Sequence, residues 1–172
     1  MENLIYRQAK IGDFQEITKI YNYHILNGFG TFEETPITNN EMKKRFNKSK
    51  KLNLPFLICE KRKKIIGFCY LSIYRNRSAY KHTFENSIYI KKKYDSRGIG
   101  HNLLEFLMKE SKKNNHIKNI IAVIGDKNNI GSIKIHKKVG FKYIGILKKV
   151  GFKKNKWIDV ILMLKKINAE SK

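Results

Sequence analysis

Apolar and polar positions along the chain follow patterns that predict seven strands and four helices. Segments with period-two alternation, or with continuous β-branched and aromatic residues, indicate strands, and they lie at 4–9, 55–60, 65–74, 82–90, 117–124, 141–149 and 157–164. Apolar residues three and four positions apart indicate helices, which begin at residues 13, 38, 98 and 129. This order predicts a mixed α/β sheet with helices on both faces.

Local signals mark where some of these elements begin and end. Asp13 with Glu16, and Thr38 with Glu41, have the spacing of capping boxes at helix starts. The glycine-containing segment 28–31 ends the first helix. The last two strands are expected to be joined around residues 151–156.

Length and composition exclude several classes of protein. The 172 residues suit one domain, 1–172. No apolar run approaches the ~20 residues that span a bilayer, and the N-terminus lacks the basic and apolar segments of a signal peptide. Cys59 and Cys69 form no metal or disulfide motif, and the five histidines show no ligand spacing. We therefore expect a cytoplasmic protein with no metal and no membrane association.

The charge of the chain has two interpretations. A formal net charge of +23 is typical of proteins that bind phosphate backbones. Only six of the 37 basic residues are arginine, although arginine reads phosphates and bases better than lysine. The second interpretation is that an AT-rich coding sequence has placed lysine at tolerant surface positions. We favour this interpretation of the lysine excess and expect no specific nucleic-acid partner.

A strand that enters a glycine-containing turn before a helix is the most informative segment. The strand ending at Ile90 is followed by Asp95-Ser96-Arg97-Gly98-Ile99-Gly100 and then by helical spacing. Such a turn presents free backbone N–H groups and the positive end of a helix dipole to an anion. The segment lacks the GxxxxGK[ST] spacing of a P-loop, which disfavours nucleotide triphosphate hydrolysis. A helix entry without a ligand is the alternative.

Downstream residues make this segment resemble the GNAT superfamily of acetyl-CoA-dependent N-acetyltransferases. That family has a pyrophosphate loop of the form [Q/R]-x-x-G-x-[G/A], followed by N-x6-[Y/H]-x3-G-F. The matching positions are Gly98, Gly100, Asn129, His136, Gly140 and Phe141. Asp95 departs from the usual Gln or Arg, so we expect its side chain to turn away from the anion or to cap the helix.

Four further segments resemble the phosphinothricin/methionine sulfoximine acetyltransferase subfamily. They are 30–34, 75–90, 150–153 and 157–160, and they occur in the same order along nearly the whole chain. The resemblance implies the GNAT fold, a central, mixed and strongly twisted sheet flanked by helices on both faces. It also implies a homodimer.

The resemblance assigns two catalytic residues. Glu85 matches the base that deprotonates the acceptor amine, and burial would raise its pKa; a solvated glutamate, or a partner for a nearby arginine, is the alternative. His136 occupies the position of a proton donor to the coenzyme A thiolate. A histidine that only positions coenzyme A is an equally open interpretation.

The remaining site residues are implied in two groups. The acetyl-CoA contacts are Ile88, Tyr89, Ile90, Ser96, Arg97, Gly98, Ile99, Gly100, Asn129 and Ser132, with backbone N–H groups of the first three polarising the thioester. The acceptor contacts are Phe32, Glu33, Arg75, Arg77, Tyr80 and Lys153. The two arginines suit a carboxylate or phosphinate, and surface charge is their alternative. Trp157 and Asp159 are expected at the pocket rim, from the same chain or from a partner. A core position is the alternative for Trp157, and a structural role is the alternative for Tyr80.

The implied activity is transfer of an acetyl group from acetyl-CoA to the primary amine of a small amino-acid-like acceptor. Phosphinothricin, methionine sulfoximine and methionine sulfone are the implied class. Two alternatives stay open: acetylation of another amine, such as a protein N-terminus, a polyamine or an aminoglycoside, and a non-catalytic basic module that associates with RNA.

Overall fold

The computed structural model describes residues 4–167 and contains one seven-stranded sheet in the order β1-β2-β3-β4-β5-β7-β6. The strands are β1 Leu4–Gln8, β2 Phe56–Lys61, β3 Lys64–Ile73, β4 Thr83–Ile90, β5 Asn119–Gly125, β6 Lys142–Lys153 and β7 Lys156–Lys166. The helices are α1 Phe14–Asn27, α2 Asn39–Lys51, α3 Ile99–Ser111 and α4 Ile130–Lys138, with short 3₁₀ turns η1 Ile11–Asp13, η2 Ser78–Tyr80 and η3 Lys92–Tyr94. The predicted order of strands and helices is confirmed.

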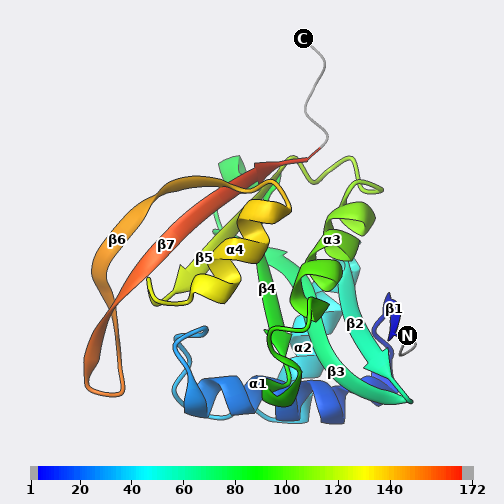
Figure 1. Cartoon of the computed structure of the whole chain (residues 1–172). Coiled ribbons are helices and arrows are strands. Elements are labelled where there is room, and N and C mark those ends of the chain that lie inside the picture. Colours follow the sequence, from blue (N-terminus) through cyan, green and yellow to red (C-terminus); the bar gives the residue numbers. More distant parts are fainter. Residues whose placement is uncertain (1–3, 168–172) are drawn as a thin grey trace.

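Two hydrophobic cores cover the two faces of the sheet, because side chains alternate along each strand. Phe68 and Tyr70 of β3 pack in the core that α1 and α2 cover. Cys69 and Leu71 of the same strand pack in the core formed with α3. The expectation of helices on both faces is therefore confirmed (Figure 1).

The only parallel pairing in the described sheet is short, and this opens the sheet in its middle. β4 pairs with β5 from Thr83 to Asn86. Beyond Asn86, β4 continues to Ile90 beside β3 alone, and Figure 1 shows β4 and β5 diverging. Backbone groups along the β5 side of the last four residues of β4 consequently have no strand partner there.

One of the two predicted capping boxes is wrong. The carboxylate of Asp13 accepts the backbone N–H of Lys10 at 2.7 Å and the guanidinium of Arg7 at 2.7 Å, and it does not cap α1. Glu16 pairs with Lys19 and Lys91 instead. The turn η1 lies directly before α1. The Asp13 carboxylate therefore caps the backbone at the start of η1, through the Lys10 N–H, and not the backbone at the start of the helix.

The second helix start is confirmed: the Thr38 hydroxyl accepts the Glu41 N–H at 3.2 Å. The last hairpin is longer than expected. β6 and β7 are joined by Lys154 and Asn155 alone, with φ of 52° and 56°. Positive φ at both positions is typical of a two-residue turn that matches the strand twist.

No helix within residues 4–167 is long and apolar enough to cross a membrane.

Candidate active site

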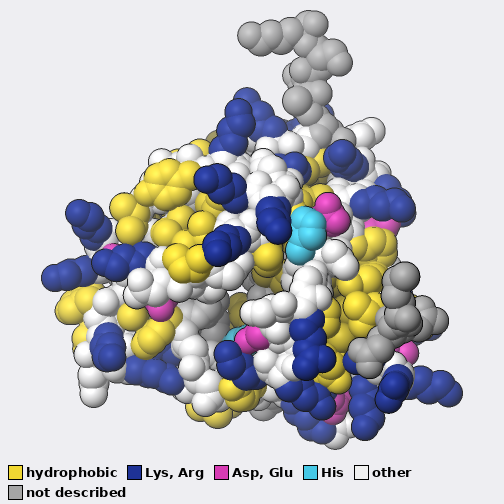
Figure 2. Space-filling model, viewed as in Figure 1, with side chains coloured by type: hydrophobic (Ala, Val, Ile, Leu, Met, Phe, Trp, Pro, Cys, Tyr) yellow, Lys and Arg dark blue, Asp and Glu magenta, His cyan; other side chains and the backbone are white. Residues whose placement is uncertain are grey.

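A cleft of about 1000 Å³ opens where β4 and β5 diverge. Its walls come from α1, the segment after α1, the end of β4, the turn before α3, the end of β5 and the start of α4, with further residues from α2 and β3. Figure 2 shows a hollow near the centre of this face. Most of the residues expected in the site line this cleft: Phe32, Glu33, Glu85, Ile88, Tyr89, Ile90, Ser96, Gly98, Gly100, Asn129, Ser132 and His136.

One end of the cleft is built from the glycine turn before α3. Gly98 is the N-cap of α3 with φ of 76°, a left-handed conformation that side chains with a β-carbon rarely adopt. Gly100 has room for no more than ordinary contact, since a β-carbon there would lie 3.4 Å from Ile135. The first N–H groups of a helix have no partner within it, and Gly98, Gly100 and His101 line the cleft, an arrangement that suits an anion.

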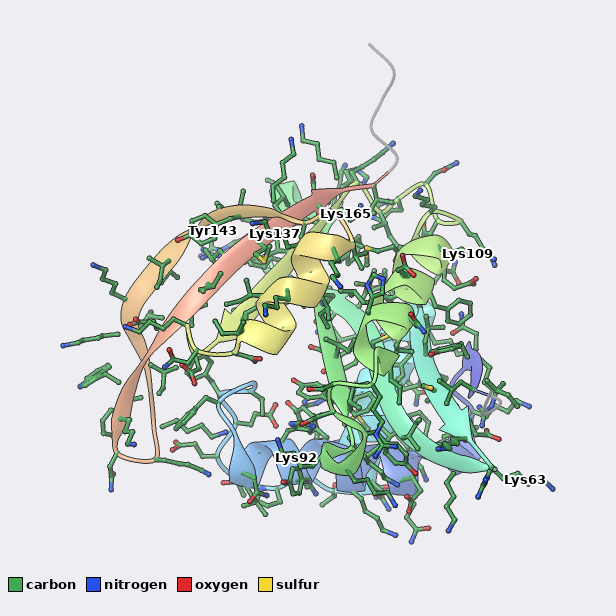
Figure 3. The ribbon with its side chains drawn as sticks, in the orientation of Figure 1. Lys63, Lys92, Lys109, Lys137, Tyr143 and Lys165 are labelled. Carbon is green, nitrogen blue, oxygen red and sulfur yellow. The ribbon has the colours of Figure 1, made fainter. Side chains whose placement is uncertain are left out.

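Asp95 of the same turn lines the cleft and does not cap α3, whereas the side chains of Arg97 and Ile99 point elsewhere. Asp95 accepts a hydrogen bond from Lys92 at 3.0 Å, so its carboxylate is held by a neighbouring cation (Lys92 is labelled in Figure 3). The guanidinium of Arg97 lies over the ring of Tyr94, at 5.7 Å, and Ile99 is buried in the core. Arg97 and Ile99 do not line the cleft, so only their backbone can take part in the anion site.

Glu85 lies in β4 immediately before the point of divergence and is half-buried. Burial raises the pKa of Glu85 to about 7, and no neighbouring charge among the described residues adds to the shift. A carboxyl group with this pKa is divided between its protonated and ionised forms near neutral pH. Such a group suits proton abstraction, because a base works best with a pKa near the operating pH.

His136 of α4 is 2% exposed and is held at both ring nitrogens. Nδ1 lies 2.8 Å from the Ser132 carbonyl, which can only accept, so Nδ1 carries the hydrogen. Nε2 therefore accepts a hydrogen bond from Nδ2 of Asn86 at 2.9 Å. Burial lowers the pKa of His136 to about 4, so the ring is neutral at physiological pH. This geometry favours a positioning role over proton donation.

Two polar residues beside His136 complete this part of the site. Asn129 caps α4, its side-chain oxygen accepting the Ser132 N–H at 3.2 Å. Asn86 lies at the last paired position of β4, and its Oδ1 is buried without a hydrogen-bond partner. Sequence reasoning missed Asn86, because its contact with His136 joins residues 50 positions apart in the chain.

The role of His136 can be tested by pH. With the folded-state pKa at about 4 and the ordinary value at 6.5, His136 stabilises the fold above pH 6.5, and this contribution is lost as pH falls toward 4. His136→Gln should lower stability at pH 7 by about 1–3 kcal/mol, since buried partners lose their bonds. It should also reduce the acid sensitivity of unfolding and keep the shape of the pH–rate profile. Urea unfolding and initial rates between pH 5 and 9 measure both.

The exposed His116→Gln variant is the control for unfolding, since His116 lies outside the cleft. Loss of a limb of the pH–rate profile in His136→Gln alone would restore the proton-donor interpretation.

The other end of the cleft contains Phe32 and Glu33 together with an arginine that sequence reasoning missed. Arg45 of α2 pairs with Glu33 at 2.7 Å and donates to the Tyr21 hydroxyl at 3.2 Å. Glu33, Arg45 and Tyr21 all line the cleft. The available signal was that Arg45 is one of only six arginines in the chain.

Four expected acceptor contacts do not line the cleft of the single chain. Arg75 is exposed and lies over the rings of Tyr74 and Tyr80, at 5.4 and 6.0 Å from their centres. Arg77 and Tyr80 are exposed on the same segment. Lys153 is buried and donates to the Thr31 carbonyl at 2.7 Å.

Two residues expected at the rim also lie elsewhere. Trp157 is 61% exposed on β7. Asp159 accepts the Lys149 N–H at 2.8 Å, which holds the bulge of β6. Neither residue lines the cleft of the single chain.

Comparison with known proteins gives one consistent result. The family model for the acetyltransferase (GNAT) domain matches residues 7–162. The chain is 38% identical over 163 residues to the phosphinothricin N-acetyltransferase of Alcaligenes faecalis, covering 95% of this chain and 82% of that protein. It is 24% identical to the L-methionine sulfoximine/L-methionine sulfone acetyltransferase of Salmonella typhimurium, covering 91% of each.

A solved structure extends the likeness to three dimensions. The phosphinothricin acetyltransferase from Sinorhizobium meliloti, in complex with AcCoA, superposes with a TM-score of 0.89 at 34% identity, covering 95% of this chain and 88% of that one. The match of the family model over most of the chain, the relative at 38% identity and the shared fold agree with the geometry of the cleft. This chain belongs to the GNAT acetyltransferase family.

Proposed function

We propose that the protein transfers the acetyl group of acetyl-CoA to the primary amine of a small amino-acid-like acceptor, of the phosphinothricin, methionine sulfoximine and methionine sulfone class. The observation that carries this proposal is a half-buried Glu85 with a pKa of about 7, in the same cleft as a glycine turn that fits an anion. The named activities of the relatives support the choice of donor and acceptor.

The residues present fit acetyl-CoA at the α3 end of the cleft. The left-handed Gly98 and the α3 N–H groups suit the pyrophosphate, and Ser96 borders the same turn. The pantetheine arm would lie along the part of β4 that has no partner in β5, beside Ile88, Tyr89 and Ile90. Asn129 and Ser132 border this path at the start of α4. Within the described residues, no cluster suited to a metal is present.

We propose the following chemistry for these side chains and backbone groups. The Glu85 carboxylate takes one proton from the acceptor ammonium, directly or through a water molecule. The neutral amine forms the new C–N bond while the C–S bond of the thioester breaks, and backbone N–H groups at the end of β4 stabilise the negative charge on the carbonyl oxygen. The nitrogen loses a second proton as the amide forms, and the leaving thiolate gains a proton to become the coenzyme A thiol. His136 keeps Asn86 in place rather than supplying this proton, because both of its nitrogens are occupied.

At the acceptor end, Glu33 and Arg45 offer opposite charges to an amino acid, which carries both. We propose that Arg45 attracts the acidic group of the acceptor, with Phe32 as an apolar wall. Arg75, Arg77 and Tyr80 stay proposed contacts for an acceptor that extends to the outer rim. The exposed arginines are not occupied by ion pairs within the described residues, which leaves them free to bind a carboxylate or phosphinate.

An acceptor panel tests the function. With acetyl-CoA present, thiol release should occur with methionine sulfoximine, methionine sulfone and phosphinothricin. It should be much slower with spermidine, an aminoglycoside and a peptide N-terminus. Turnover restricted to one of these other amines would replace the acceptor class. No turnover across the panel, together with RNA binding at physiological salt, would favour the non-catalytic alternative.

We propose a homodimer formed through the hairpin of β6 and β7. Six large apolar side chains there are 46–61% exposed: Tyr143, Ile144, Leu147, Val150, Phe152 and Trp157. Apolar side chains gather over this hairpin in Figure 2, and Figure 3 labels Tyr143 on β6. An exposed apolar edge strand favours pairing with another copy.

Analytical ultracentrifugation, which measures the mass of the sedimenting species, tests the proposed dimer. The wild type should sediment at twice the 20.3 kDa chain mass, and Val150→Glu should shift it to the monomer because a buried unpaired charge is costly. Lys148→Glu, on the same strand, should leave the dimer intact. A wild-type monomer at micromolar concentration would contradict the dimer.

We also propose that residues 1–172 form one domain that acts in the cytoplasm without a specific nucleic-acid partner. The single sheet that spans the described residues supports the first point. Buried, unpaired Cys59 and Cys69 are typical of a reducing compartment.

A further inference from the structure

The segment Gly28–Glu34, which follows α1, packs against β5 and β6 at two glycine positions, Gly125 and Gly151. A β-carbon on Gly125, at the end of β5, would collide with the backbone carbonyl of Phe29. A β-carbon on Gly151, in β6, would lie 2.6 Å from two ring carbons of Phe32. The absence of side chains at these two positions therefore allows the segment to approach β5 and β6 closely.

A buried lysine fastens the same segment. Lys153 is 1% exposed, and its ammonium donates to the Thr31 carbonyl at 2.7 Å. The Thr31 hydroxyl lies 3.1 Å from the Tyr21 hydroxyl, inside the core. Burying an ammonium is costly unless it is hydrogen-bonded, so this bond couples β6 to the backbone directly before Phe32.

The contacts of Phe32 and Glu33 show why this fastening concerns the cleft. Phe32 has β6 on one side and lines the cleft on the other. Glu33 forms an ion pair with Arg45 at 2.7 Å, and both residues line the cleft. A displacement of the ring away from β6 would thus alter the width of the acceptor end, whereas the α3 end contains none of these residues.

We propose that Gly151 and Lys153 of β6 are positioning residues that set acceptor specificity, by holding Phe32 and Glu33 at the wall of the cleft. This inference rests on the proposed function for the identity of the acceptor. It changes the expectation for Lys153, which acts through Thr31 rather than by contacting the acceptor. Acceptors with long side chains depend on this wall more than short ones, since they reach farther into the space beside Phe32.

Kinetics of Gly151→Ala test the inference. The KM for methionine sulfone should rise about tenfold or more, as expected when a wall moves by less than the size of a methyl group, while the KM for acetyl-CoA stays unchanged. Gly145→Ala is the matched control, because it adds the same methyl group to β6 with nothing within 4 Å. In a Phe32→Ala background, Gly151→Ala should have no further effect on the acceptor KM.

The same split should appear when the lysine is removed. Lys153→Met keeps the length of the side chain and removes the donor, so the acceptor KM should rise without a change for acetyl-CoA. Lys156→Met, at the exposed position opposite in β7, is its control. Equal increases of both KM values in Gly151→Ala or Lys153→Met, or no increase beyond the controls, would overturn the inference.

Hydrogen–deuterium exchange separates this inference from the proposed function. Peptides covering 28–34 should exchange faster in Gly151→Ala and Lys153→Met than in the two controls, whether or not any acceptor is turned over. A wild type that acetylates none of the panel would refute the proposed acceptor class and leave the exchange result as the test of the fastening. Unchanged exchange at 28–34 in both variants would overturn the fastening itself.

Discussion

Replacing Glu85 by Gln should lower kcat about 10²- to 10⁴-fold, the range expected when a general base is lost. The amide has nearly the same size as the carboxyl group but cannot take a proton from the acceptor ammonium. Affinity for acetyl-CoA should stay the same, because the pyrophosphate end of the cleft lies at α3 and not at Glu85. Steady-state kinetics with saturating acceptor measure kcat, and Glu110→Gln, outside the cleft, is the control.

The pH profile and the stability of this variant follow from the same pKa. Wild-type kcat/KM should increase with pH, with the midpoint of the increase near the Glu85 pKa of about 7. The Glu85→Gln variant should not show this increase. A carboxyl group whose folded pKa is raised destabilises the fold as pH rises from its ordinary 4.5 through about 7. At pH 8, Glu85→Gln should therefore be more stable than wild type, by about 1–3 kcal/mol. Unchanged turnover, or lower stability at pH 8, would remove Glu85 from the role of base.

Replacing Gly98 by Val should weaken acetyl-CoA binding about 100-fold. A β-branched residue at φ of 76° is strained by about 1–3 kcal/mol. If the turn relaxes to relieve this strain, N–H groups that bind the pyrophosphate move, and each charged hydrogen bond contributes about 1.5–3 kcal/mol. The KM for the acceptor at saturating acetyl-CoA should change little.

Isothermal titration calorimetry measures the affinity of this variant. Gly12→Val is the control, because Gly12 has no positive φ and a β-carbon there meets nothing within 4 Å. An affinity for acetyl-CoA equal in Gly98→Val and Gly12→Val would contradict the assignment of the turn before α3 to the pyrophosphate.

Features encoded by neighbouring residues could be predicted from the sequence. The order of strands and helices follows from hydrophobic periodicity, and Thr38 caps α2 as its spacing with Glu41 predicts. The glycine turn at 98–100 is recognisable because glycine adopts the left-handed conformation of Gly98 without steric cost. Asp13 shows the limit of spacing rules alone, since Arg7 at the end of β1 and the Lys10 N–H engage the carboxylate expected to cap α1.

Contacts between distant segments could not be predicted in this way. The pairing of Asn86 with His136, of Lys153 with Thr31 and of Arg45 with Glu33 depends on how strands and helices are brought together by the sheet. These contacts support the positioning roles proposed for His136 and Lys153. They also place Arg45, rather than Arg75 or Arg77, in the cleft of the single chain.

The most direct test of the central claim is to identify the product formed from isotope-labelled acetyl-CoA and methionine sulfone. NMR and mass spectrometry should find the labelled acetyl group on the α-nitrogen, in a one-to-one ratio with the coenzyme A thiol released, and Glu85→Gln should form this product far more slowly. Thiol release without an N-acetyl product, or a label carried by another amine of the panel and not by methionine sulfone, would contradict the account.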